Sequence, residues 1–300
     1  MIHEHLSSIW APIASTMANH LWQSTLFAIV VGLLTLMLHK NQARIRYWLW
    51  MAASLKFLIP FSLLVDMGKH LARPRNFTAA QPGFYVAMEE VSQPFTQSTM
   101  HTTFPVAHSA TLPTVAHLLP VPLAAVWLCG VCAVLLIWYA RWRKISATMR
   151  GSALLRVGRE VEALRRLERR GGIRKPIKVV LSRASMEPGI FGILQPVLLW
   201  PEGISERLDN AHLEAILAHE VWHVRRRDNQ AAAVHMMVEA IFWFHPLVWW
   251  LGARLVEERE RACDEEVLQM GSAPQVYAES ILKACEFCVG FDHVEMPSAN

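Results

Sequence analysis

Two histidines and a glutamate stand at the spacing that zinc hydrolases use. They belong to the run His219-Glu220-Val221-Trp222-His223, an H-E-x-x-H pattern. One turn of an α-helix takes about 3.6 residues, so both imidazoles leave one face of a helix and can bind the same Zn²⁺. Glu220 lies beside them and can take a proton from a water molecule during hydrolysis. The alternative is a chance match, because the chain has 14 histidines.

A hydrolytic zinc site needs a third protein ligand and one open position. Glu260 and Asp264 lie four residues apart downstream, so on a helix they share a face. One carboxylate can then bind the metal while the other accepts the N–H of a ligand histidine. We predict Glu260 as the third ligand and Asp264 as that support, against the alternative of a solvated charged face. Asp228 either belongs to the surroundings of the site, where it ties the end of the helix to the neighbouring arginines, or is an ordinary acid at the end of the helix.

The elements that must position these side chains can be predicted from periodicity. Asp209-Asn210 is an N-cap candidate for a helix over 209–228 that carries the pattern. The runs 176–182 and 189–200 are typical of short strands bounded by Pro and Gly. The spacing of leucines and valines over 152–170 predicts an amphipathic helix that stops at Gly171-Gly172. An α+β domain with a small sheet follows from these elements.

The composition of the chain indicates a membrane protein. Hydrophobic residues make up 53% of the 300 positions and charged residues only 18%, which excludes intrinsic disorder. Three apolar runs are long enough to cross a bilayer, at about 9–38, 47–67 and 121–140. We therefore predict a mainly α membrane protein with a membrane region at 1–144.

The distribution of basic residues predicts the orientation. Residues 141–183 hold 14 Lys and Arg against three Glu, and the short loop 39–46 is also basic. The positive-inside rule places both on the cytoplasmic side, and the loop 68–120 outside, although Lys69, Arg73 and Arg75 conflict with this. No nucleic-acid-binding signature accompanies the arginines, so we expect a lipid bilayer as partner and no direct binding of nucleic acid.

The apolar stretch 231–256 sets a geometric condition. A single crossing would separate the histidines from Glu260 by about 30 Å. Either the stretch does not cross, or it is a helical hairpin broken near His245-Pro246, or the third ligand is wrong. Pro246 and the polar residues within the stretch favour the hairpin.

Taken together, these segments resemble one known family, the membrane zinc metallopeptidases of the β-lactam-sensor and methicillin-resistance-regulator type. The resemblance covers most of the chain, and its segments occur in the family's order. They are Leu21-Trp22-Gln23, 56–60 (KFLIP), 187–192 (EPGIFG), 196–201 (PVLLWP), the pattern at 219–223 with 225–228 (RRRD), 244–246 (FHP) and 260–264 (ERACD).

The resemblance implies a gluzincin-like zinc protease domain at 145–285, with His219, His223 and Glu260 as ligands and Glu220 as general base. It also implies an integral protein of the bacterial cytoplasmic membrane that acts in signal transduction and leads to cleavage of a cytoplasmic transcriptional repressor or of itself. The alternative is a non-catalytic receptor or scaffold with a protease-like domain. The family's antibiotic sensors continue into a fourth span and an extracytoplasmic domain, so the tail 286–300 leaves open a fragment of a longer protein. Whether the chain forms a homodimer is also left open.

Overall fold

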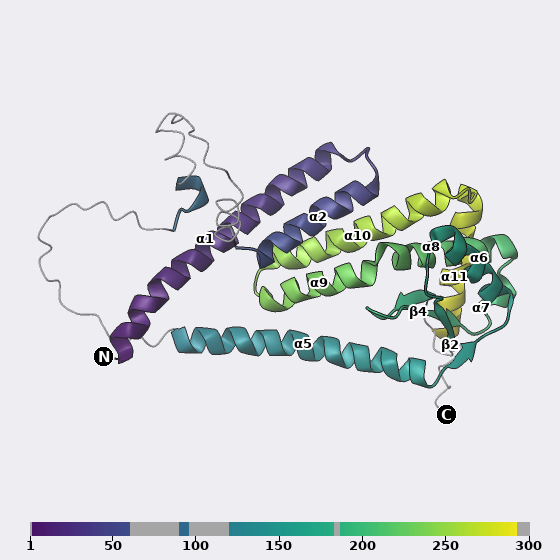
Figure 1. Cartoon of the computed structure of the whole chain (residues 1–300), viewed down its shortest axis with the longest axis horizontal. Helices are drawn as coiled ribbons and strands as arrows, with labels where there is room; N and C mark the ends of the chain where they lie inside the picture. Colours follow the sequence, from purple (N-terminus) through teal and green to yellow (C-terminus); the bar gives the residue numbers. More distant parts are fainter. Residues whose placement is uncertain (1, 61–89, 96–119, 183–186, 293–300) are drawn as a thin grey trace, which may run out of the picture. The chain divides into compact units, whose positions relative to one another are not determined.

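The structure, a computed structural model, describes residues 2–60, 90–95, 120–182 and 187–292 (Figure 1). Most of these residues are helical, and a small sheet lies in the second half of the chain. The helices are α1 (Ile2–Met37), α2 (Ala43–Leu58), α5 (Pro120–Arg150), α6 (Arg159–Gly171), α7 (Ile204–Arg207), α8 (Asn210–Arg226), α9 (Asp228–Ile241), α10 (Pro246–Gln269) and α11 (Pro274–Asp292). The strands are β1 (Ala153–Leu155), β2 (Lys178–Ser182), β3 (Gly189–Phe191) and β4 (Val197–Pro201).

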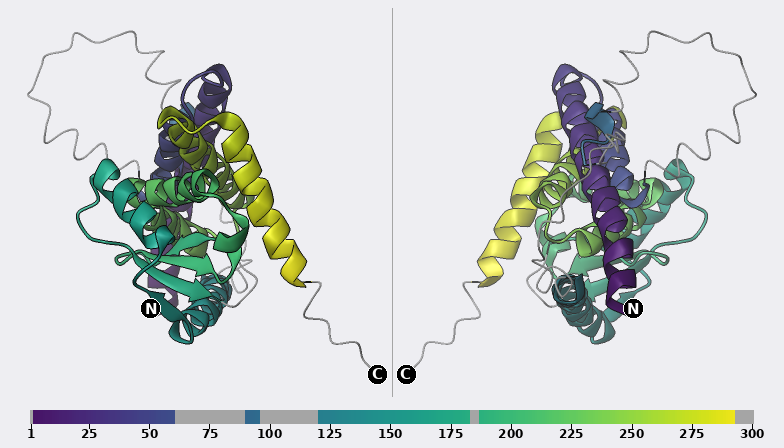
Figure 2. Two further views of the ribbon diagram at one scale, coloured as in Figure 1. Left: turned by 90° about the vertical axis from the view of Figure 1, so that its right-hand side faces the viewer. Right: turned by 90° about the vertical axis from the view of Figure 1, so that its left-hand side faces the viewer.

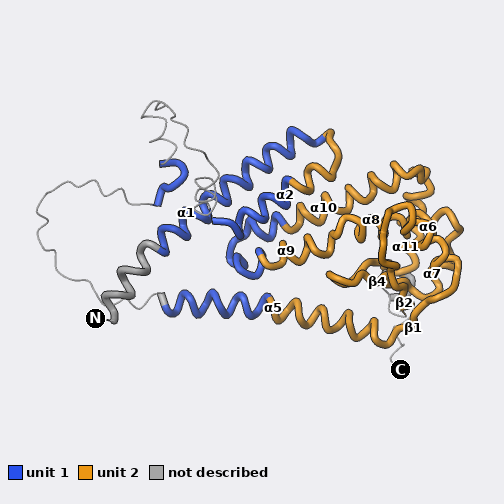
Figure 3. Tube along the Cα trace, in the orientation of Figure 1, with its two compact units in different colours: residues 1–39, 49–134, 238–251 blue, residues 40–48, 135–237, 252–300 orange. Residues whose placement is uncertain are grey.

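The chain divides into two compact units, each made of segments that are distant in sequence (Figure 3). Unit 1 contains residues 1–39, 49–134 and 238–251, and unit 2 contains residues 40–48, 135–237 and 252–300. Helices α2, α5, α9 and α10 contribute residues to both. The predicted division of the chain at residue 144 stays a prediction.

Two helical segments among the described residues are long and apolar enough to cross a membrane. They are Ile13–Met37 in α1 and Val121–Arg150 in α5. No residue in the most apolar part of α5 is buried, as expected for a helix that faces lipid. Of the predicted span 47–67, the structure has α2 as far as Leu58, and positions 61–67 lie outside the described residues. The same holds for most of the predicted loop 68–120.

The sheet of unit 2 has the strand order β1-β2-β4-β3. The central strands β2 and β4 are parallel, and β1 and β3 pair with them antiparallel at the two edges. Leu198 and Trp200 of β4 are almost completely buried, because β4 has a neighbour on each side and helices cover the sheet. Strand β3 has a neighbour on one side only, and this edge lies next to α8.

Helices α6, α8 and α11 supply most of the remaining core of unit 2. Leu164 and Leu167 of α6 and Leu213 and Leu217 of α8 are each at most 2% exposed. Helix α11, yellow in Figure 2, packs along α8 and adds Phe287 to the same core. Helix α8 therefore lies among the sheet, α6 and α11, which fixes the face that carries the H-E-x-x-H pattern.

The structure corrects the predicted helix over 152–170. Residues 153–155 form the edge strand β1, and the helix begins only at Arg159. Gly158 has φ 146°, a conformation outside the helical region that interrupts the pattern. The other predicted elements of this region are confirmed, since β2 lies within 176–182 and α8 begins after Asp209. Run 189–200 is split into β3 and β4.

A glycine turn separates β3 from β4. Gly192 has φ 93°, and a Cβ atom there would lie 2.3 Å from the backbone oxygen of Gln195. Only glycine fits such a turn without rearrangement.

The apolar stretch 231–256 is not one continuous helix. Helix α9 ends at Ile241, and α10 begins at Pro246, whose missing N–H and fixed φ suit the first turn of a helix. At the end of the chain, α11 continues to Asp292, so residue 286, the predicted start of the tail, lies inside a helix.

Candidate metal centre

Helix α8 presents His219 and His223 on one face. The imidazole ring centres are 4.8 Å apart, and the rings meet edge to face. The Asp209 carboxylate caps the helix by accepting the backbone N–H of His212 at 2.9 Å. At the other end Arg227 adopts a left-handed conformation, with φ 59°. The local sequence thus fixes both ends of the helix and therefore the direction of the two imidazoles.

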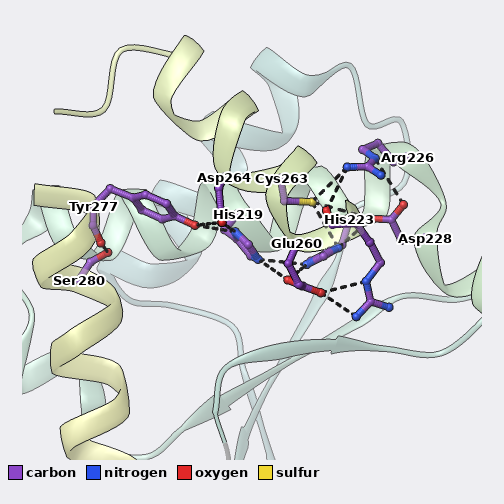
Figure 4. Close-up of polar contacts among 10 residues, drawn as sticks. His219, His223, Arg226, Asp228, Glu260, Cys263, Asp264, Tyr277 and Ser280 are labelled. Atoms are coloured by element: carbon purple, nitrogen blue, oxygen red, sulfur yellow. Dashed lines mark hydrogen bonds and ion pairs between the residues drawn. The ribbon is translucent and has the colours of Figure 1, made fainter. Parts of the chain in front are cut away.

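Helix α10 brings Glu260 to these histidines, although it lies 37 positions after His223. Figure 4 shows the three side chains turned toward one another. The Nε2 atoms of His219 and His223 are 3.1 Å apart, and Oε2 of Glu260 lies 3.2 and 3.5 Å from them. Zinc bonds of 2.0–2.1 Å place tetrahedral ligand atoms about 3.3 Å from each other. The three atoms therefore have the spacing of three corners of a zinc tetrahedron, and the donor set fits the metal.

Two further groups contact the other ring nitrogen of His219. Nδ1 lies 2.7 Å from the Tyr277 hydroxyl and 3.2 Å from Oδ1 of Asp264, and the hydroxyl donates to the same carboxylate at 2.6 Å. Asp264 is where the sequence predicted a support. Tyr277 comes from α11 and was missed, since no spacing relates it to the histidines. Together they fix the tautomer and the direction of the imidazole.

Asp228 holds the second histidine in the same way. Its Oδ2 atom lies 2.8 Å from Nδ1 of His223, and its side chain is only 1% exposed. The left-handed turn at Arg227 brings this carboxylate back toward the helix end. Arg226 approaches its other oxygen at 3.4 Å, and the buried thiol of Cys263 lies 3.4 Å from the same imidazole nitrogen. Asp228 therefore ties the helix end to Arg226, which is the first of the two alternatives, and it also supports His223.

Arg259 determines which oxygen of Glu260 faces the histidines. Its Nε and Nη2 atoms both donate to Oε1, at 2.9 and 2.7 Å. Oε2 is left for the histidine side. Glu260 is thereby prepared to bind a metal through one oxygen. This contact could not be predicted from the spacing, because neighbours on a helix seldom face each other.

The electrostatics of the cluster favour protonated histidines and an ionised Glu260. Burial lowers the pKa of His219, but hydrogen bonds to Asp264 and Glu260 outweigh it and raise the pKa to about 9. Burial likewise opposes the charged form of His223, while contacts with Asp228, Cys263 and Glu260 raise its pKa to about 12. Burial disfavours ionised Glu260, yet the two histidines and Arg259 hold its pKa well below the usual range. A divalent cation bound here replaces these protons, since histidine binds metals in its neutral form.

Glu220 lies beside the cluster and is 7% exposed. Burial raises the pKa of its carboxyl, against the lowering effect of His223 and His219. The backbone N–H of Ile190 in β3 donates to this carboxyl. Glu220 is therefore positioned between the two histidines and the edge strand of the sheet.

A cavity of about 280 Å³ opens next to these residues. One wall carries His219, Glu220 and Glu260. Apolar side chains from α8 and α11, including Ile216 and Ile281, form another part of the lining. Such a cavity provides polar groups for chemistry and apolar surface for one side chain of a ligand.

Four other side chains that could take part in catalysis do not line this cavity. His212, His235 and Arg227 carry N–H groups of the kind that can stabilise an oxyanion, but none of the three lines the cavity. A Ser-x-x-Lys pattern, the spacing of serine acyl-enzymes, occurs at Ser280 to Lys283. Ser280 is completely buried and donates to the Tyr277 carbonyl at 2.6 Å, so it packs the helix rather than acting as a nucleophile.

Comparison with known proteins gives a family match over most of the chain. The model of the BlaR1 peptidase M56 family matches residues 15–293. Among curated proteins, the regulatory protein BlaR1 of Bacillus licheniformis is 29% identical over 136 residues, which cover 39% of this chain and 22% of that protein. The methicillin resistance mecR1 protein of Staphylococcus aureus is 28% identical over 112 residues, 37% of this chain and 19% of that protein. The matched part thus spans about a fifth of the length of these relatives.

Proposed function

Because the chain belongs to the BlaR1 peptidase M56 family, a family of metallopeptidase type, we propose that it is a membrane-embedded, zinc-dependent endopeptidase. The observation that carries the proposal is the spacing of the three donor atoms of His219, His223 and Glu260, at 3.1 to 3.5 Å. A receptor or scaffold that transmits a signal by contact alone needs neither this spacing nor a buried carboxylate beside it. The two candidate membrane helices support the membrane part of the proposal.

The chemistry divides between the metal and the protein. Zinc in this position supplies a Lewis acid that polarises a peptide carbonyl and lowers the pKa of water. Glu220 takes a proton from the attacking water and passes it to the leaving amine. Its burial favours this role, because burial raises the pKa of the carboxyl and so makes the carboxylate a stronger base toward water.

The edge strand β3 offers a binding place for an extended peptide. The N–H of Ile190 faces Glu220, and its C=O accepts from the Asn229 amide at 3.1 Å. Both backbone groups therefore point away from β4 and out of the sheet. A substrate strand that replaces the Asn229 amide pairs with this edge and lays its backbone along the cavity.

We propose that the start of α2, residues 43–48 of unit 2, transmits a signal to the metal site. Arg46 forms an ion pair with Glu258 of α10 at 2.8 Å, and both side chains are under 10% exposed. The backbone N–H of Ala43 donates to both carboxylate oxygens of Glu265, at 3.1 and 2.9 Å.

The same segment also contacts the end of α8. The guanidinium of Arg226 lies over the ring of Tyr47, 5.0 Å from its centre, and Arg226 approaches the Asp228 carboxylate that holds His223. A displacement of residues 40–48 thus reaches a metal ligand through three contacts.

The biological setting is proposed from the family and from charge. The excess of basic residues in 141–183 supports a cytoplasmic protease domain. We propose that the substrate is a cytoplasmic transcriptional repressor or the chain itself, and that the bilayer is a constant partner.

The test combines zinc content with signalling. We expect about one zinc per chain in the detergent-purified wild type and a marked loss of zinc in Glu260→Ala. Glu220→Gln should keep its zinc, because Glu220 is not a ligand. Purified Glu220→Gln should remain folded but fail to cleave the proposed substrate, a transcriptional repressor or the chain itself. Signalling that persists unchanged in cells carrying Glu220→Gln would overturn the protease proposal and favour the receptor or scaffold.

A further inference from the structure

A second cavity of unit 2, of about 570 Å³, lies at the other end of the β3 edge. Four of the side chains that line it are basic, and no Asp or Glu is among them. We call this cavity the cationic groove. The lining residues that matter here are Arg174, Lys175, Arg225, Arg227, His223 and Ile190.

The four basic side chains of the groove come from two separate segments. Arg174 and Lys175 lie between α6 and β2, and Arg225 and Arg227 lie at the end of α8. All four are exposed, and within the part of the chain that the structure describes none of them has a carboxylate partner. Like charges repel one another when they gather without counter-charges. The cluster therefore presents an uncompensated site for anionic groups.

One of these arginines is held in place by an aromatic ring. The guanidinium of Arg225 stacks over the Trp222 ring at 4.2 Å from its centre. Such stacking leaves the in-plane N–H groups of the guanidinium available for a carboxylate.

The groove and the catalytic cavity lie at opposite ends of one strand. Glu187 and Pro188, just before β3, line the catalytic cavity. Gly192 and Ile193, just after β3, line the groove. A peptide that pairs antiparallel with β3 therefore runs from the groove to the catalytic cavity. Its residues before the cleaved bond lie in the groove, and those after it lie against the apolar wall.

We propose that the cationic groove binds acidic side chains of the substrate, on the N-terminal side of the bond that is cleaved. The inference rests on the proposed function for the position of the bond, but the binding of acidic peptide does not require hydrolysis. A lipid headgroup is the competing ligand, because Ile193 and Leu194 at the β3–β4 turn are 54% and 84% exposed. The peptide is favoured since His223 and Ile190 also line the groove, which makes it continuous with the site.

Binding is measured first, in a chain that cannot cleave. The full-length Glu220→Gln protein in detergent without phospholipid is titrated into two rhodamine-labelled peptides. One is Glu-Asp-Glu-Ala-Leu-Gln-Ser-Ala, and its uncharged counterpart is Gln-Asn-Gln-Ala-Leu-Gln-Ser-Ala. We expect about tenfold tighter binding of the acidic peptide at 50 mM salt, from several exposed ion pairs of modest strength. Most of this difference should disappear at 500 mM salt because the charges are screened.

Paired variants locate the effect. Arg174→Gln combined with Arg225→Gln should remove the preference for the acidic peptide. The matched control is Arg166→Gln with Arg169→Gln, two exposed arginines of α6 that do not line the groove, which should keep it. Equal binding of both peptides by the Glu220→Gln protein, or loss of the preference in the control pair alone, would overturn the proposal. So would groove-dependent binding of phosphatidylglycerol, seen by native mass spectrometry, without discrimination between the peptides.

The position of the acidic residues is read from cleavage. The wild-type chain with zinc is given a mixed peptide library, and the products are sequenced by mass spectrometry. Acidic residues should be enriched before the cleaved bond and lose that enrichment in the Arg174/Arg225 pair. Enrichment after the bond, or none, overturns the inference while leaving the protease intact. Absence of any cleavage, with the binding preference retained, contradicts the proposed function alone.

Discussion

The two carboxylates that hold the histidines should differ in their effect on zinc affinity. Asp228 is 1% exposed and is 2.8 Å from Nδ1 of His223. Asp264 is 43% exposed and 3.2 Å from Nδ1 of His219, where the Tyr277 hydroxyl at 2.7 Å also acts. Groups of this kind contribute about 10- to 100-fold to metal affinity.

From this geometry, Asp228→Asn should weaken zinc binding about 100-fold, or roughly 2.7 kcal/mol. The charge it removes is screened least, and no hydroxyl replaces it. Asp264→Asn should weaken binding by less than about tenfold, because solvent screens this carboxylate and Tyr277 remains. The assay is competition for zinc between the detergent-purified chain and a chromophoric chelator.

A loss of folding has to be separated from a loss of affinity, since Asp228 also pairs with Arg226 at 3.4 Å. The melting temperatures of wild type and both variants in excess chelator provide this control. A larger affinity loss in Asp264→Asn than in Asp228→Asn, with both metal-free proteins folded, would refute the reasoning from burial.

Three other perturbations concern the frame around the site, and each is followed by thermal melting of the detergent-purified chain. Arg46→Ala removes the buried partner of Glu258, which keeps only its ion pair with the half-exposed Arg261. The change should destabilise the fold by about 3 kcal/mol, with partial recovery in the double variant Arg46→Ala/Glu258→Ala; no recovery would argue against a direct pair. Gly192→Ala should cost about 2 kcal/mol and more than Gly172→Ala, because both have positive φ but only Gly192 would bring a Cβ within 2.3 Å of backbone. Equal losses would contradict the steric argument. The backbone N–H of His212 lowers the pKa of the Asp209 carboxyl, so this cap stabilises the protein above pH of about 4 and is lost as the pH falls. The melting difference between wild type and Asp209→Ala should therefore shrink below that pH, and a difference that grows on acidification would contradict it.

The parts of the site that follow from local periodicity could be predicted from the sequence. His219, Glu220 and His223 occupy one helix, so their relation needs only the helical repeat. The same reasoning paired Glu260 with Asp264 on a second helix. The contact of Asp228 with His223 could not be decided, because it depends on a single left-handed residue, Arg227, and arginine has no special preference for that conformation.

Contacts between segments that are distant in the sequence could not be predicted from local sequence patterns. Tyr277 reaches His219 only because α11 packs along α8. The wrong helix over 152–157 has the same origin. Leu154 and Leu155 satisfy a helical period, but β1 gains an antiparallel partner in β2, and strand pairing of this kind overrides local preference. Prediction was best for elements whose own amphipathic pattern specifies the face that is buried.

The three ligands also constrain the apolar stretch between them. His223 precedes α9 and Glu260 lies in α10, yet their donor atoms are 3.5 Å apart within unit 2. The 14 residues of α9 advance about 21 Å along its axis, so the chain must return by a similar distance before Glu260. The 14 residues from Pro246 to Arg259 supply that length. A cation bound by His219, His223 and Glu260 would hold α8 and α10 together at this point. Metal affinity therefore reports whether α9 and the first part of α10 bring Glu260 back to the histidines.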